Sequence, residues 1–144
     1  MSLLARMLVL FVVIFHTIVF VVETFFWMQP AVHQFALRRL TEQANLSSYD
    51  QALVLKTVFV NLGFYNLFLA IAGTIGLAIF ARGHASAGRA LMGYACFSAA
   101  GAGIVLLVST HAYIAAFLQA APAAAALAMM FRAIALDPIA GSRQ

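Results

Sequence analysis

Residues 3–28 read LLARMLVLFVVIFHTIVFVVETFFWM, an apolar run in which Arg6 and Glu23 are the only charged side chains. About 20 apolar residues in a helix suffice to cross the hydrocarbon core of a bilayer, so this run is long enough to span it. The run is longer than a signal peptide, and its end, VVETFF over residues 21–26, offers no small-residue cleavage site. It therefore predicts an uncleaved membrane-spanning helix.

The composition of the whole chain agrees with this prediction. Of the 144 residues, 65% are hydrophobic and only 8% are charged, whereas soluble domains carry about 25% charged residues. This excludes both an ordinary soluble domain and a disordered tail. The sequence predicts an all-α integral membrane four-helix bundle, built as a single transmembrane domain over residues 1–144, with spans at about 3–28, 57–80, 90–108 and 111–131.

The connection after the first run has the pattern of a short helix in the membrane interface, with an irregular loop as the alternative. Its apolar side chains recur at helical spacing beside two arginines; they are Val32, Phe35, Ala36 and Leu40, next to Arg38 and Arg39. A capping box of Ser48 and Gln51 then predicts the start of a helix that runs to Phe80. Because this helix is longer than a bilayer needs, its first turns up to Lys56 are expected among the lipid headgroups.

The basic residues predict an orientation in the membrane. The side of the amino terminus carries Arg6, Arg82, Arg89, Arg132 and Arg143. The opposite side carries Arg38, Arg39 and Lys56, together with Glu42 and Asp50. By the positive-inside rule, both termini are expected in the cytoplasm, with the bacterial inner membrane as the location. The net charge of +4 forms no phosphate-tracking cluster, so the bilayer is the expected partner and nucleic acid is not.

Small residues recur every four positions in the last two spans. They are Ala95, Ala99 and Gly103 in the third span, and Ala116, Ala120 and Ala124 in the fourth. Such stripes let helix backbones approach closely in lipid. They favour packing within the chain, and the interface of a homodimer or higher homo-oligomer is the alternative.

Six polar residues inside the spans fall in one layer. They are His16, Glu23, Asn61, Tyr65, Asn66 and Gln119. A rise of 1.5 Å per residue places them about 6 to 18 Å from the helix ends that face away from the termini. His16 and Glu23 also share one stripe of the first helix with Trp27. Because polar groups in a span are costly, this layer predicts a pocket that opens toward the outer side.

The polar layer leads to three functional hypotheses. In the first, His16 and Glu23 are the catalytic pair of an isomerisation or another proton transfer. The ligand would be a small lipophilic molecule, bound by Trp27, Asn61, Tyr65, Asn66 and Gln119. The second hypothesis is a dimeric proton-coupled transporter with Glu23 as the exchanging carboxylate. The third is an accessory or structural subunit whose polar groups only hold the helices together.

A haem or metal cofactor finds too few ligands in this pattern. Bis-histidine haem ligation needs a second histidine at the depth of His16, and a metal site beside His16 and Glu23 lacks a third strong ligand. No metal site is predicted, and the sequence identifies no cofactor.

The chain resembles the domain-of-unknown-function 1304 family of short bacterial membrane proteins. The matching residues are His16 with Glu23 and Trp27, the element Asn61-Leu62-Gly63-Phe64-Tyr65-Asn66, and Gln119 with Pro122-Ala123. The chain departs from the family pattern at Phe15 and Leu62, where the family usually has Glu and Gln. The resemblance implies a four-helix membrane protein in which the polar residues belong to one shared pattern. It implies no particular reaction.

Overall fold

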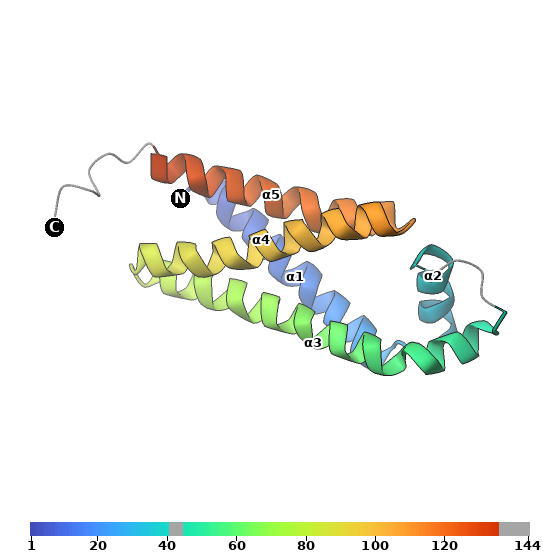
Figure 1. Ribbon diagram of the computed structural model, residues 1–144. Helices are drawn as coiled ribbons and strands as arrows, with labels where there is room; N and C mark the ends of the chain where they lie inside the picture. Colours follow the sequence, from blue (N-terminus) through green and yellow to red (C-terminus); the bar gives the residue numbers. More distant parts are fainter. Residues whose placement is uncertain (41–44, 136–144) are drawn as a thin grey trace.

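The computed structural model describes residues 1–40 and 45–135, with side chains described as far as residue 132. Glu42 and Arg143, which entered the charge pattern, lie outside this part. The described chain is helical throughout, without strands (Figure 1). Its helices are α1 (Leu3–Phe25), α2 (Pro30–Leu40), α3 (Ser48–Ala81), α4 (Ala85–Ser109) and α5 (Tyr113–Ala135).

Every helix except α2 is long and apolar enough to cross a membrane. This confirms the predicted all-α bundle of four membrane-spanning helices. The observed helices differ from the predicted spans by a few residues at their ends, where composition says least about helix boundaries. The connection after α1 contains a helix, α2, rather than an irregular loop throughout.

The predicted capping box of α3 is displaced by one residue. Ser47, not Ser48, caps the helix, and its Oγ accepts a hydrogen bond from the backbone amide of Asp50 at 3.1 Å. Gln51 instead donates from Nε2 to the carbonyl of Leu46 at 2.8 Å. Ser47 has extended backbone angles, as a capping residue requires, and an acidic residue three positions later suits the positive end of a helix.

A glycine turn makes α3 and α4 antiparallel neighbours. Gly83 has a φ of +92°, in the left-handed region that glycine adopts without strain. The amide of His84 donates to the carbonyl of Ile79 at 3.2 Å, and that of Gly83 donates to Phe80 at 3.1 Å. This hydrogen-bond pair is the Schellman ending of a helix, so the chain reverses within three residues.

The four long helices form a closed ring in which α1 packs on α3, α3 on α4, α4 on α5, and α5 on α1. Helix α1 is tilted relative to the other helices. Its amino-terminal end lies beside α5, and its other end lies beside α3 (Figure 1). Helix α2 lies across the end of the bundle that is farther from the termini (Figure 1). Below, that end is called the outer end and the opposite one the inner end.

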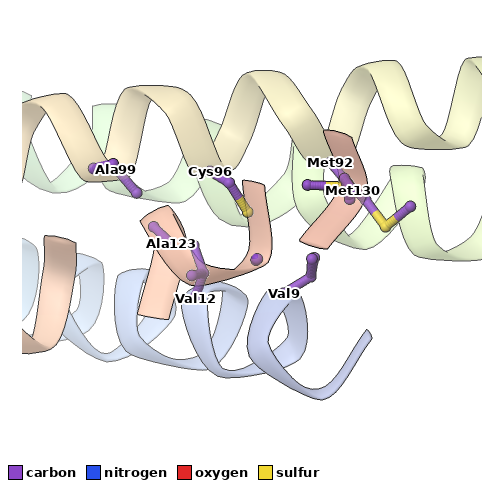
Figure 2. Packing of buried hydrophobic residues seen from close by; sticks show 9 residues of the cluster. Val9, Val12, Met92, Cys96, Ala99, Ala123 and Met130 are labelled. Atoms are coloured by element: carbon purple, nitrogen blue, oxygen red, sulfur yellow. The ribbon is translucent and has the colours of Figure 1, made fainter. Parts of the chain in front are cut away.

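The main hydrophobic core occupies the inner half of the bundle. Side chains of α1, α4 and α5 meet there; they are Val9, Val12, Met92, Cys96, Ala99, Ala100, Ala123, Ala126 and Met130 (Figure 2). A second, smaller cluster lies at the outer end, and its buried members are Trp27, Leu37, Ala52 and Phe59. The bundle thus has an apolar core at each end and the predicted polar layer between them.

Close backbone contacts hold neighbouring helices together. A side chain on Gly63 or Gly73 of α3 would collide with α1, and one on Gly76 would meet the backbone of Met92 in α4. A Cβ atom on Gly103 of α4 would lie 2.7 Å from the backbone nitrogen of Ala120 in α5. Most members of the two small-residue stripes therefore pack within the chain, while Ala124 is exposed.

We expect Gly103→Ala to destabilise the bundle, because the added methyl group collides with the backbone of α5 and forces the two helices apart. The free energy of unfolding should fall by about 1 to 3 kcal/mol. Gly101→Ala is the matched control, since a Cβ atom there meets nothing within 4 Å. Unfolding in detergent with increasing sodium dodecyl sulfate, followed by circular dichroism, measures both; equal losses would contradict the assigned contact.

Candidate functional site

The residues on the inward face of α1 are fully buried in the inner half of the helix and only partly buried beyond it. The fully buried members of this stripe are Ala5, Val9, Val12 and His16. Beyond His16 the same face continues through Val19 and Glu23, which are only partly buried. His16 is therefore the last enclosed residue of the stripe, at the border between the inner core and the polar layer.

A matching stripe on α5 is interrupted by one polar residue. Its buried members are small or flexible, and they are Ala116, Ala123, Ala126 and Met130. Gln119 falls on this face at helical spacing between Ala116 and Ala123, and it is the member left partly exposed. The stripe thus carries one polar, partly exposed side chain between its buried members.

His16 and Gln119 follow the core on two antiparallel helices. Val12 of α1 and Ala123 of α5 belong to the same buried cluster. One turn toward the outer end from Val12 is His16, and one turn toward the outer end from Ala123 is Gln119. Both polar side chains therefore lie one turn beyond the main core, toward the outer end.

The ring of His16 has one bonded nitrogen and one free nitrogen. Its Nδ1 lies 2.8 Å from the carbonyl oxygen of Val12. A carbonyl only accepts, so Nδ1 carries the proton of this hydrogen bond. Nε2 is buried without a partner in the described residues. In the neutral form of the ring, Nε2 would carry the unshared electron pair.

Glu23 and Asn66 form the one side-chain hydrogen bond between long helices in the described part of the chain. Nδ2 of Asn66 donates to Oε2 of Glu23 at 3.0 Å and also to the carbonyl of Leu62 at 3.0 Å. This bond brings the two groups to one level, although distances along each helix placed them about 6 Å apart in depth. The two side chains span this difference.

Oε1 of Glu23 accepts no hydrogen bond from the residues that the structure describes, and the side chain is only partly buried. A carboxylate can accept about four hydrogen bonds. Glu23 therefore retains an unused acceptor at the edge of the α1–α3 contact, within a membrane span.

Trp27 lies in the outer cluster rather than in the polar layer. It is 2% exposed, its ring stacks on Phe59 with 3.5 Å between ring centroids, and Nε1 donates to the carbonyl of Ala52 at 2.8 Å. The ring stacking and this hydrogen bond join the chain just after α1 to the outer turns of α3. The arrangement gives Trp27 a structural position, apart from the other predicted site residues.

Asn61 and Tyr65 point away from the bundle. Tyr65 is 66% exposed, and Asn61 is also exposed without a side-chain hydrogen bond to any described residue. The reason is the close contact of Gly63 with α1, which sets the inward face of α3. Positions two residues before and after Gly63 lie about 200° around the helix, whereas Asn66, three residues after it, shares its face.

The structure also contains a polar residue that the sequence analysis passed over. Oγ1 of Thr24 is buried without a hydrogen-bond partner in the described chain, and it lies against Gly63. In the sequence, only its position next to Glu23 indicates that Thr24 belongs to the polar layer. The hydroxyl group of a threonine in a helix normally bonds to a carbonyl of the same helix, so threonine is not counted among the costly polar residues. Thr24 is buried because α1 packs against α3 with Thr24 opposite Gly63.

Metal ligands do not gather at this site. Among the described residues, no three His, Cys, Asp or Glu side chains come together as a metal-binding group. Two hollows in the surface lie elsewhere. One, of about 400 Å³, is at the inner end between α4 and α5, and the other, of about 220 Å³, lies between Arg39 and the turn before α5.

One comparison with known proteins gives a match. A family model described as "Protein of unknown function (DUF1304)" matches residues 10–131, which include all the polar residues discussed above. Neither the curated proteins nor the solved structures contain a match.

We expect Asn66→Leu to lower the free energy of unfolding by about 0.6 kcal/mol, and by no more than about 1.7 kcal/mol, because it removes the one hydrogen-bond donor that Glu23 has among the described residues. Asn61→Leu is the matched control, since it replaces an exposed asparagine of the same helix and should change stability by less than about 0.5 kcal/mol. Unfolding in mixed micelles compares the two, and an equal loss would argue against the hydrogen bond.

Proposed function

The chain belongs to the domain-of-unknown-function 1304 family, and we propose that it is a membrane protein that binds a small lipophilic molecule between its helices. The observation that carries this proposal is the carboxylate of Glu23. It lies in a helix that can span a membrane, and among the described residues it accepts one hydrogen bond, from Asn66, which leaves its second oxygen without a donor. A polar group in a span is costly, so such an unused acceptor favours a ligand.

Lateral entry from the bilayer fits this site better than entry from water. Helix α2 and the outer cluster around Trp27 cover the outer end, and the main core fills the inner end. The partly buried Glu23 and Gln119 lie between these two clusters. A molecule that reaches them through the hydrocarbon must itself be lipophilic and carry at least one group that forms hydrogen bonds.

His16 and Glu23 suit a proton transfer on such a ligand. Seven residues separate them on one helix face, a rise of about 10.5 Å, so they do not exchange a proton directly. A ligand lying along this face would meet the free Nε2 of His16 at one end and the Glu23 carboxyl group at the other. One group takes a proton from a carbon and the other returns a proton to a different carbon, which is an isomerisation.

The arrangement of charges supports the orientation expected from the sequence. Arg6, Arg82, Arg89 and Arg132 lie at the inner end, whereas Arg38, Arg39 and Lys56 lie at the outer end. We propose on this basis that both termini are cytoplasmic and that the protein resides in a bacterial inner membrane.

We expect a lipophilic molecule to remain bound when the protein is extracted from membranes in mild detergent. Native mass spectrometry should detect it as an added mass. Glu23→Gln and Gln119→Ala should each lose the adduct, because they remove hydrogen-bonding groups of the site. Thr17→Ala should keep it, since Thr17 is an exposed residue of α1 that bonds to the carbonyl of Val13.

Incubation of the wild-type protein in D₂O separates binding from catalysis. A proton transfer at carbon should introduce deuterium into the extracted molecule, and Glu23→Gln or His16→Gln should prevent this. An adduct without deuterium would indicate that the protein binds the molecule without catalysing a proton transfer on it. An adduct of equal intensity in all variants would contradict the site.

Substrate-dependent proton movement in proteoliposomes, together with a dimer, would instead indicate a proton-coupled transporter.

A further inference from the structure

A groove of about 400 Å³ separates the start of α4 from the end of α5 at the inner end of the bundle. Its walls are apolar except at one end. They are formed by Ser86, Arg89, Ala90 and Gly93 of α4 and by Leu127, Met130 and Phe131 of α5. The groove lies far from Glu23 and Asn66, in the opposite half of the spans.

Gly93 leaves the floor of this groove open. Glycine in a helix interior costs roughly 0.5 to 1 kcal/mol relative to alanine, and most glycines in these spans are explained by a neighbouring helix that a side chain would strike. A Cβ atom on Gly93 would meet nothing within 4 Å. No neighbouring helix fills this position, so a side chain added to Gly93 would occupy the groove itself.

Arg89 supplies a free cationic group at the mouth of the groove. It is partly buried, and within the described chain its guanidinium makes no hydrogen bond or ion pair. It lies four residues, about 6 Å, from the start of α4, and Gly93 is one turn deeper on the same face. The groove thus has a cationic group at headgroup depth and apolar walls below it.

Among the described residues, the charged side chains at the inner end are all basic. Arg6, Arg82 and Arg132 lie at the same end of the bundle as Arg89. The acidic residues in the described part of the chain, Glu23 and Asp50, lie in the polar layer and at the outer end. A zwitterionic headgroup would bring its own cation near these arginines, whereas an anionic headgroup is attracted to them.

We propose that this groove binds one anionic phospholipid, with its phosphate on Arg89 and an acyl chain over Gly93. A lipid in the leaflet at the inner end has this orientation, with its headgroup at the membrane surface and its acyl chains directed toward the midplane. Guanidinium groups bind phosphate through paired, charge-assisted hydrogen bonds, and the hydroxyl of Ser86, one turn from Arg89, offers a further donor.

The test is lipid binding to the purified, delipidated full-length protein, measured by native mass spectrometry. The probes are dioleoylphosphatidylglycerol and dioleoylphosphatidylcholine, which share their acyl chains and differ in charge. The wild type should bind one phosphatidylglycerol molecule about tenfold more tightly than phosphatidylcholine. Arg89→Gln should remove this preference, and Gly93→Leu should weaken the binding of both lipids by filling the groove.

Two matched variants control for general effects of charge and side-chain volume. Arg38→Gln removes an exposed arginine at the outer end, and Gly101→Leu adds the same volume to α4 where a Cβ atom also meets nothing. Both should bind phosphatidylglycerol as the wild type does. Thermal melting followed by circular dichroism checks folding, and Ala90→Leu, which fills the groove from its exposed edge, replaces Gly93→Leu if that variant unfolds.

Three outcomes would overturn the proposal. The first is wild-type lipid binding by both groove-filling variants. The second is an equal loss in Arg89→Gln and Arg38→Gln, which would indicate diffuse attraction between a basic protein and anionic lipid. The third is displacement of the lipid by excess soluble glycerophosphate, which would indicate a phosphate site without a place for the acyl chain.

Discussion

Contact between helix backbones at glycine is the constraint on which this bundle depends. Lipid tails are as apolar as the helix surfaces, so burial of hydrophobic side chains gives little drive for association, and close packing supplies it instead. Gly63, Gly76 and Gly103 bring α1 to α3, α3 to α4, and α4 to α5. Each contact also sets the rotation of its helices, and this rotation decides which side chains face inward. The polar layer is therefore a result of glycine placement as much as of the polar residues themselves.

The bundle is packed unevenly along its length, and the candidate site lies where the packing changes. Alanines and Met92 close the inner half around Val9 and Val12, and Trp27 with Phe59 closes the outer end. Between these clusters the inward faces of α1 and α5 carry His16, Glu23 and Gln119 in place of apolar side chains. Ionisable groups without partners are costly in a low-dielectric medium. Glu23 and Gln119 are only partly buried, whereas His16 is fully buried.

The sequence predicted the helices of this fold well, because each span is a long apolar run whose length matches a bilayer. It also predicted packing within the chain by the small-residue stripes of the last two spans, which contain Gly103 and Ala120. It did not predict rotation about each helix. Asn61, Tyr65 and Asn66 share a short motif and similar depth, yet only Asn66 reaches α1, because Gly63 sets the inward face. The position of Trp27 depends likewise on where the outer turns of α3 meet the end of α1.

The hydrogen bond between Glu23 and Asn66 joins residues 43 positions apart in the chain. During synthesis at about 5 to 20 residues per second, the carboxyl group therefore exists for roughly 2 to 9 s before its partner has been made. Throughout that interval Glu23 is without Asn66. The mean hydropathy of α1, 2.5 over 18 residues, is the highest of the four long helices. The most apolar of these helices is thus the one that carries Glu23, whose partner is made later.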